Sequence, residues 1–391
     1  MRFPYYSPNF GLLDLLRVLF TSATKAEGAI LEYYKQITGK NYAFLTNSCR
    51  TALYLAYQAL GKQGEVITSP LTCKVAIDPI VESGNKPIYA DITIDDLNIN
   101  PKDIENRITN NTIAIQAIHL GGVSCNMDRI GDIAMRSQLI VIEDCAQSLG
   151  SYYKDKHTGS FGDIACFSLI KNAYGIGGGV FATNNLEVYK RALSINKTFS
   201  KPSKVLLYYR AIRNIFDTYR FSLLGQLLYE ILIMIKGSQK SFSSIKNQLK
   251  QISSIEKCIA SIQLKKYEKL HNCRQKIGGE LSAQLQKENL MFNKSNPYKS
   301  SFSKFFIYNP QIKSLKHISE LHKLGVEVMH LEQSKSSPVQ DWLVDKNIAL
   351  SSGLKNYAKV HNHILSIPIT ERYGNDEIDE ITNTLIKALL K

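Results

Sequence analysis

The residues best suited to chemistry lie between Leu139 and Thr183, where apolar runs end in polar or small residues. Asp144 closes the first run, Ser168 and Lys171 close the second as a Ser-x-x-Lys pair, and a glycine-rich turn leads into the third. A carboxylate can keep a ring nitrogen protonated, a hydroxyl can bind a phosphate, and an amine can condense with an aldehyde. Together these groups match what pyridoxal 5′-phosphate (PLP) needs from a protein.

Each of these residues has a candidate role. Lys171 is the candidate Schiff-base lysine, because the glycines that follow it let the backbone approach a flat ligand. Asp144 is the candidate partner of the pyridine nitrogen, and Gln147, three residues on, is placed to hydrogen-bond the ring hydroxyl. Ser168 is expected to reach the phosphate. The structural alternatives are a surface lysine, a helix cap and a serine bonded to backbone.

A second group of small polar residues, in the sequence TNSCRT, stands just ahead of a helical pattern. Amides and hydroxyls at a helix N-terminus bind phosphate well. Ser48, Cys49, Arg50 and Thr51 are therefore candidates to hold the phosphate with amides, a hydroxyl and a cation. A plain N-cap is the alternative.

These side chains need elements that bring them together. Over the first two-thirds of the chain, strand-like runs alternate with helical patterns such as 50–60 and 127–137. The strand-like runs are 65–69, 86–91, 113–120, 139–144, 164–169 and 179–184. Buried runs separated by helices predict a parallel or mixed sheet covered on both faces, with ligands beyond the carboxyl ends of its strands. Asp144 and Lys171 both stand at such ends.

The last third of the chain has a different pattern. It becomes helical from about residue 250, and residues 300–391 are typical of a small α+β unit. We therefore expect a large PLP-binding α/β domain over residues 1–250 and a long helix with a small C-terminal domain over 251–391. A basic, apolar insertion at about 204–236 interrupts the first of these.

Half of the net charge of +14 is concentrated in residues 201–250, which hold nine Lys or Arg and two acids. The apolar run 221–235 is too short for a membrane span, which needs roughly 20 apolar residues. Two interpretations stay open: a helical pair folded onto the protein or its dimer mate, and an interfacial helix on an anionic membrane. We expect no nucleic-acid partner, because no fold or motif spacing supports one.

The cysteines, the histidines and the first residues of the chain limit the classes of protein to which it could belong. The seven cysteines are scattered without a C-x-x-C, and the eight histidines show no metal spacing, so we expect neither a disulfide framework nor a metal. Asp14 and Arg17 interrupt the first apolar run, which predicts an amphipathic lead-in helix rather than a signal peptide. These observations favour a cytoplasmic protein.

Taken together, these motifs resemble the DegT/DnrJ/EryC1/StrS family of PLP-dependent sugar aminotransferases. The likeness runs nearly end to end, from NSCRTALYLAYQALG near the start to ILSIPIT near the end. Its most specific block is VIEDCAQSLGSYYKDKHTGSFGDIACFS. The resemblance implies the aspartate-aminotransferase fold (PLP fold type I), with a large mixed-sheet domain and a small C-terminal α+β domain.

The resemblance also implies an activity. Such enzymes are homodimers with the active site at the interface, and they transfer an amino group, usually from glutamate, to a keto group on a nucleotide-linked sugar. The expected product serves surface polysaccharide, such as lipopolysaccharide O-antigen or capsule. By motif, Asp144, Gln147, Ser168 and Lys171 match the ring-nitrogen acid, the residue at the ring oxygen, the phosphate hydroxyl and the Schiff-base lysine. A dehydratase branch of the family has histidine in place of that lysine, so Lys171 argues against that branch.

The chain departs from the family pattern at four places. Ser168 and Lys171 are closer together than in the commoner pattern, which marks a compact branch. Cys73 stands where an aromatic residue usually stacks on the PLP ring, and Gly177 where the glycine-rich turn often carries an acid. Residues 236–253 replace a stretch that reaches into the partner's site. Two further functions stay open: a degenerate or regulatory PLP-binding protein, and a PLP enzyme with a membrane-associated substrate.

Overall fold

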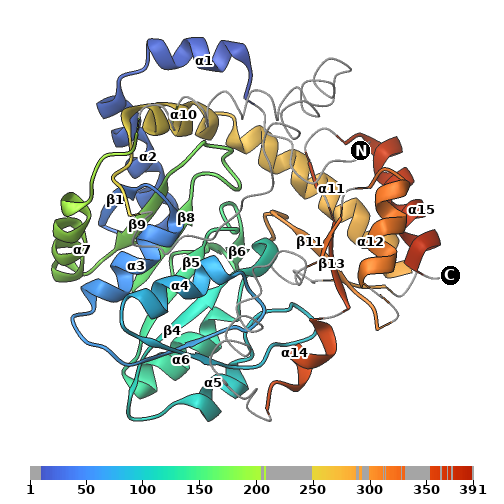
Figure 1. Ribbon diagram of the computed structural model, residues 1–391, viewed down its shortest axis with the longest axis horizontal. Coiled ribbons are helices and arrows are strands. Elements are labelled where there is room, and N and C mark those ends of the chain that lie inside the picture. Colours follow the sequence, from blue (N-terminus) through green and yellow to red (C-terminus); the bar gives the residue numbers. More distant parts are fainter. Residues whose placement is uncertain are drawn as a thin grey trace.

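Two sheets of different size organise the chain (Figure 1). The computed structural model describes residues 10–203, 207, 249–287, 290–292, 299–310, 312, 314–326, 328–330, 353–361, 363–367, 369–370 and 373–389.

The larger sheet has seven strands. They are β1 (Tyr42–Thr46), β2 (Glu65–Thr68), β3 (Lys86–Tyr89), β4 (Thr112–Ile118), β5 (Ile140–Cys145), β8 (Ile164–Ser168) and β9 (Gly179–Thr183). Their spatial order is β1-β9-β8-β5-β4-β2-β3. Strands β3, β2, β4, β5 and β8 pair in parallel, whereas β9 runs antiparallel to both β8 and β1. The sheet is therefore mixed, as the sequence predicted.

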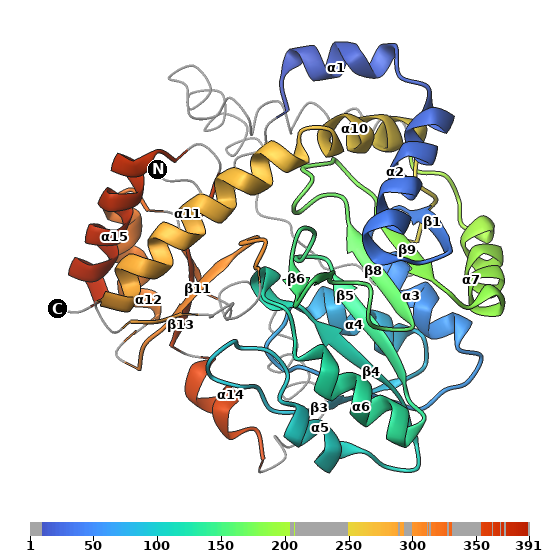
Figure 2. The same ribbon diagram turned by 180° about the vertical axis from the view of Figure 1, so that it is seen from behind.

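Helices cover both faces of this sheet, as Figures 1 and 2 show from opposite sides. They are α2 (Ala23–Thr38), α3 (Cys49–Ala59), α4 (Lys74–Glu82), α5 (Pro101–Arg107), α6 (Met127–Ser137), α7 (Leu186–Thr198) and α10 (Ser254–Leu264). On one face α3, α4 and α7 form a core with alternate strand residues such as Ile142 and Cys166. On the other, α2 and α10 pack near Ala165 and Phe167, and α5 and α6 near Val141. This two-sided burial confirms the predicted α/β fold class.

A smaller antiparallel sheet lies toward the C-terminus. Its strands are β10 (Met291–Phe292), β11 (Phe305–Tyr308), β12 (Met329–His330) and β13 (Ile364–Ile367), in the order β10-β11-β13-β12. The helices of this part are α11 (Tyr267–Lys287), α12 (Ser314–Lys323), α14 (Lys355–Val360) and α15 (Asn375–Leu389). The long helix α11 runs from the larger sheet to the smaller one (Figure 1). The predicted small α+β unit is thus present, and a division at residue 250 stays a prediction.

Some elements differ from the sequence expectations. Strand β1 was not predicted, because its five residues form an edge of the sheet and its partner β9 lies far along the chain. The predicted lead-in helix is α1 (Leu12–Leu19), and a short hairpin joins β6 (Tyr152–Tyr153) to β7 (Lys156–His157). Among the described helices, none is both long and apolar enough to cross a bilayer.

The basic insertion at 204–236 lies outside the described residues except for Leu207, which is buried. The chain on either side of it comes together. Ser200 and Lys250 form a bridge, the Lys250 amine donates to the Ser200 hydroxyl at 2.8 Å, and the Gln251 amide donates to the Ser200 carbonyl at 2.9 Å. The two ends of the segment between Ser200 and Lys250 therefore lie side by side, which is consistent with an insertion at this place.

Candidate active site

The central strands β4, β5 and β8 end at the same edge of the larger sheet. In their register Asp144 lies between Ile118 on one side and Cys166 on the other. Side chains alternate along a strand, so Asp144 faces the layer of α3, whereas Glu143 and Cys145 face the opposite layer. The sequence prediction that Asp144 stands at a strand end is correct.

Asp144 is a buried carboxylate, with 4% of its surface exposed. Its Oδ1 accepts the Ala146 amide at 3.0 Å and lies 3.8 Å from Sγ of Cys49. Burial raises the pKa of Asp144, and the nearby Lys171 amine is the strongest influence in the opposite direction. The charged form of a buried carboxylate is stabilised by a nearby cation more strongly than that of an exposed one.

The N-terminus of α3 lies beside this carboxylate and is capped locally. The Ser48 hydroxyl accepts the Thr51 amide at 3.1 Å, and the Thr51 hydroxyl lies 2.6 Å from the Asn47 side-chain oxygen. Cys49 directs its thiol to Asp144 and to the Cys166 carbonyl, at 3.4 Å. Burial raises the pKa of that thiol. Cys49 can therefore offer a ligand its backbone amide rather than its side chain.

The glycine-rich turn packs directly on this helix start. The Gly178 amide donates to the Asn47 carbonyl at 2.9 Å, and Gly178 has a φ of 104°, which favours glycine. A Cβ atom on Gly179 would lie 2.5 Å from the backbone nitrogen of Cys49. The turn and the helix start thus pack backbone against backbone, with no room for a side chain between them. A phosphate would bind beside this contact, at the amides of the α3 N-terminus.

Lys171 lies in a short closed loop after β8. The Ser168 hydroxyl accepts the Ile170 amide at 3.3 Å, and the Gly175 amide returns to the Leu169 carbonyl at 2.7 Å. Lys171 is half-buried and acts electrostatically on both Asp144 and Cys49. The structure therefore brings Lys171, Asp144 and the α3 N-terminus together.

Three other sequence candidates surround this cluster. Gln147 is buried, and its side-chain oxygen accepts the Gly121 amide at 2.9 Å. Arg50 and Cys73, the latter just before α4, are half-buried and close enough to interact electrostatically. Burial lowers the pKa of Arg50, and Asp78 opposes that effect.

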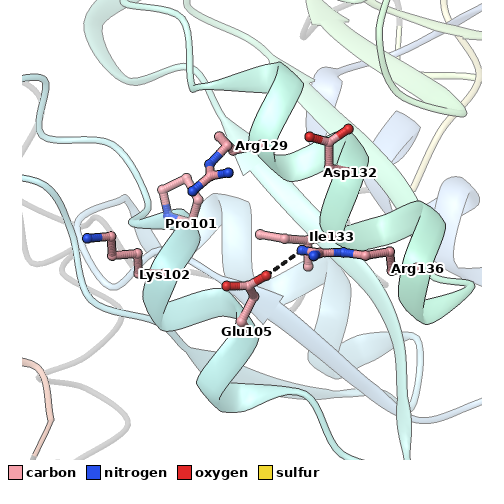
Figure 3. A pocket seen from close by; sticks show the side chains of 7 residues that line it. All are labelled: Pro101, Lys102, Glu105, Arg129, Asp132, Ile133 and Arg136. Carbon is pink, nitrogen blue, oxygen red and sulfur yellow. Dashed lines mark hydrogen bonds and ion pairs between the residues drawn. The ribbon is translucent and has the colours of Figure 1, made fainter.

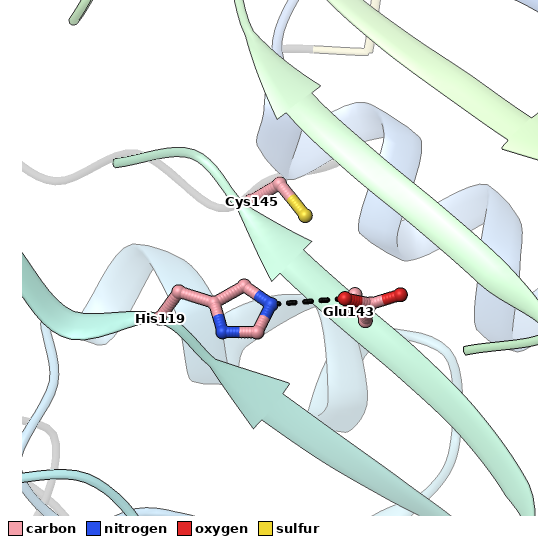
Figure 4. Close-up of side chains that lie close together, drawn as sticks. All are labelled: His119, Glu143 and Cys145. Carbon is pink, nitrogen blue, oxygen red and sulfur yellow. Dashed lines mark hydrogen bonds and ion pairs between the residues drawn. The ribbon is translucent and has the colours of Figure 1, made fainter. Parts of the chain in front are cut away.

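His119, Glu143 and Cys145 form a buried group (Figure 4), with their possible ligand atoms within 4.8 Å of one another. His119 Nδ1 accepts the Cys125 amide at 3.1 Å, so Nε2 carries the proton that is donated to Glu143, at 3.0 Å. Glu143 also accepts amides of Gly159, Phe161 and Gly162. Burial works against its charge, but the hydrogen bonds from His119 and these amides prevail and hold its pKa below the usual range. Because these bonds occupy the atoms of His119 and Glu143 that a metal would need, we interpret the group as a structural brace.

Glu256, which the sequence reasoning missed, lies against the glycine-rich turn. It is buried at the start of α10, and a Cβ atom on Gly177 would meet its carboxylate. An acid therefore does reach this turn, although residue 177 itself carries none. The Ser253-x-x-Glu256 capping box was a readable signal for its place in the helix, but not for its contact with the turn.

A shallow surface pocket lies elsewhere, between α5 and α6 (Figure 3). The ion pair between Arg136 and Glu105, at 2.5 Å, crosses it. None of the residues that line it is a candidate for the site described above.

Comparison with known proteins shows which family and which relatives this chain is similar to. The family model described as the DegT/DnrJ/EryC1/StrS aminotransferase family matches residues 23–386. The spore coat polysaccharide biosynthesis protein SpsC of Bacillus subtilis (strain 168) is 35% identical over 195 residues, 47% of this chain and 50% of SpsC. The GDP-perosamine synthase of Escherichia coli O157:H7 is 40% identical over 156 residues, 39% of this chain and 43% of that enzyme. The matches thus span half or less of these two relatives.

The fold matches over a much longer stretch. The structure of Helicobacter pylori PseC, an aminotransferase involved in the biosynthesis of pseudaminic acid, superposes with a TM-score of 0.77 at 20% identity. That superposition covers 100% of both chains. At this identity the likeness concerns the fold alone.

Proposed function

The chain belongs to the DegT/DnrJ/EryC1/StrS aminotransferase family of PLP-dependent enzymes, and from this premise we propose that it transfers an amino group from glutamate to a keto group on a nucleotide-linked sugar. The observation that carries the proposal is the convergence of the Lys171 amine, the buried Asp144 carboxylate and the α3 N-terminus at one edge of the sheet. Bound PLP supplies an electron sink for a substrate carbanion.

Lys171 and Asp144 would work on opposite parts of the cofactor. Lys171 would hold it through Nζ, and the same Nζ, when free, would move a proton during amino transfer. Asp144 would hold a proton at the ring nitrogen, because a buried carboxylate is stabilised by a cationic partner. Gln147 has its side-chain oxygen fixed by Gly121, so its amide nitrogen remains to donate to the ring oxygen.

The phosphate would bind at the start of α3, beside the glycine-rich turn. The Ser48 cap uses the Thr51 amide, so we assign the phosphate to the amides of Cys49 and Arg50. The Ser168 hydroxyl accepts the Ile170 amide and can donate its own hydrogen to a phosphate oxygen. Cys73 would face the ring in place of an aromatic residue.

The substrate class is supported by the relatives. One is named for spore coat polysaccharide biosynthesis and another for GDP-perosamine synthesis, so we propose surface polysaccharide as the destination of the product. We also propose a homodimer that completes the site. The exposed apolar side chains of α1 and its end, Leu13, Leu19 and Phe20, support such an interface.

A membrane-associated substrate is the weaker candidate. It rests on residues 204–236, which apart from Leu207 lie outside the described residues. A cytoplasmic location remains a prediction from the sequence.

The test combines PLP binding with chemical trapping. Wild type, Lys171→Ala and the control Lys154→Ala, which removes an exposed lysine, are mixed with PLP and reduced with borohydride. Peptide mass spectrometry should find the cofactor on Lys171 in wild type and in the control, and glutamate should then convert unreduced wild type to the pyridoxamine form. Equal labelling of Lys171→Ala at another lysine would overturn the assignment of Lys171. A loaded enzyme that glutamate leaves unchanged would overturn glutamate as donor.

A further inference from the structure

The residue after Lys171 is tied to distant parts of the chain. Asn172 is fully buried, and its side-chain nitrogen donates to the carbonyls of Leu149 at 3.0 Å and Gln147 at 3.3 Å. It also lies 3.3 Å from the hydroxyl of Ser301, which precedes β11. The backbone next to Lys171 is therefore fixed by the segment that follows Asp144 and by the approach to the smaller sheet.

Arg274 of α11 holds the same loop from another side. Arg274 is 2% exposed, and the two terminal nitrogens of its guanidinium lie 3.4 Å and 3.5 Å from the Asn172 carbonyl. Its Cζ also lies 4.8 Å from the centre of the Tyr174 ring. A buried guanidinium is costly unless it is partnered, so these contacts constrain both the helix and the loop.

Tyr174 gives this contact a conformational consequence. Its φ is 51°, in the left-handed region that residues other than glycine seldom adopt. The ring is buried beneath Arg274, and the next amide, that of Gly175, closes the loop onto Leu169. Holding Tyr174 in this conformation therefore maintains the closed loop that carries Lys171.

Helix α11 connects the loop to the smaller sheet. Near its start, the Tyr267 hydroxyl donates to the Leu149 carbonyl, and its ring stacks on His271 with 5.6 Å between ring centres. Further along, Ile277 and Leu281 belong to the core of the smaller sheet. Arg274 lies between these two regions, so a shift of the smaller sheet would reach the Lys171 loop through one helix.

We propose that Arg274 is a positioning residue that places Lys171 by holding Asn172 and Tyr174. Through this contact the position of the smaller sheet affects the rate at which Lys171 attaches the cofactor. The inference rests on the role of Lys171 proposed above. Arg274 touches neither reacting group in this account and acts through the loop.

The test uses the full-length protein without cofactor first. Hydrogen exchange of the amides in residues 169–178 is compared in wild type, Arg274→Met, Arg274→Lys and the control Lys269→Met, which changes an exposed cation on the same helix. We expect faster exchange in Arg274→Met, a smaller change in Arg274→Lys, and none in the control. Wild-type exchange in Arg274→Met would overturn the clamp.

The second readout is the rate at which added PLP attaches to Lys171, followed by borohydride trapping. We expect attachment and kcat to fall by about tenfold or more in Arg274→Met, with KM for glutamate little changed, because a misplaced group affects reaction more than binding. An unchanged attachment rate would overturn the coupling to Lys171. If wild type does not attach PLP at Lys171, the proposed function fails, whereas the exchange comparison still tests the clamp.

A second variant tests the proposal if Arg274→Met does not fold. If circular dichroism shows that Arg274→Met does not fold, Tyr174→Leu decides, because it removes the aromatic ring beneath the guanidinium and leaves Arg274 in place. Faster exchange and slower attachment in Tyr174→Leu would support the proposal, and wild-type values for both would overturn it.

Discussion

The carboxylate of Glu256 takes the space that a side chain on Gly177 would need. A Cβ atom on Gly177 would lie 2.0 Å from Oε1 of Glu256. The other carboxylate oxygen accepts the amide and the hydroxyl of Ser253, both at 2.9 Å, so the capping box holds Glu256 against the turn. In this chain, therefore, the acid next to the glycine-rich turn comes from α10.

We expect Gly177→Ala to lower the free energy of unfolding by about 1–3 kcal/mol, the usual cost of overpacking a filled site. Urea unfolding measures the change. The control is Gly131→Ala in α6, where a Cβ has nothing within 4 Å and a helical alanine should be neutral or stabilising. In a Glu256→Ala background the cost of Gly177→Ala should shrink, because the clash is gone. Equal costs in the two backgrounds would contradict the contact.

The Asp144→Asn variant should keep or raise the thermal stability of the protein but slow amino transfer. The folded state raises the pKa of Asp144 through burial, so ionising this carboxylate becomes a cost of folding as the pH rises above its ordinary range. Without cofactor, the variant should therefore melt at the same or a higher temperature than wild type at pH 7. With PLP, amino transfer should slow by about a hundredfold or more, because a charge placed for the reaction is lost. Near wild-type transfer would remove Asp144 from the site.

Ser168→Ala should weaken PLP binding by about tenfold, the effect of losing one hydrogen bond to a charged group. Fluorescence titration of the cofactor-free protein with PLP measures it. Ser194→Ala in α7, an exposed serine bonded only to the Arg191 carbonyl in the described structure, is the matched control. If both variants bind PLP equally well, Ser168 does not contact the phosphate.

The protein should lose stability on acidification because of His157. Its Nε2 accepts the Gly150 amide at 2.7 Å, and burial lowers its pKa to about 4. A base with a depressed pKa contributes stability above its unfolded pKa of 6.5, and that stability is lost as the pH falls toward about 4. We expect His157 to account for about 2 kcal/mol of the free energy of unfolding between pH 7 and pH 5. Urea unfolding at the two pH values should show a smaller loss in His157→Gln, and an identical loss would reject this origin.

The sequence was sufficient to predict that Asp144, Lys171 and the start of α3 lie close together, because these residues stand next to strongly patterned strands. Asp144 lies at the end of β5 and Lys171 follows β8, and these neighbouring parallel strands end at one edge of the sheet. The capped start of α3 was readable for a similar local reason, since small polar residues precede its helical pattern.

The distant residues that contact the glycine-rich turn and the Lys171 loop could not be predicted in the same way. Glu256, Arg274 and Ser301 reach them from far along the chain and belong to elements whose local patterns report only their own helix or strand. Their contacts depend on how two sheets and α11 pack, which no periodicity encodes. Strand β1 escaped for a related reason, because its place is set by pairing with β9.

The contact between Asn172 and Ser301 joins residues that are 129 positions apart. At about 5–20 residues per second, a ribosome takes roughly 6 to 26 s to add the intervening chain. During that time the nascent chain already contains Lys171 but lacks Ser301, and for most of it the chain lacks Arg274 as well. The order of synthesis therefore delays completion of the proposed cofactor site until the smaller sheet begins to emerge. A chain truncated before residue 274 would contain Lys171 but lack both contacts that hold its loop, those of Arg274 and Ser301 with Asn172.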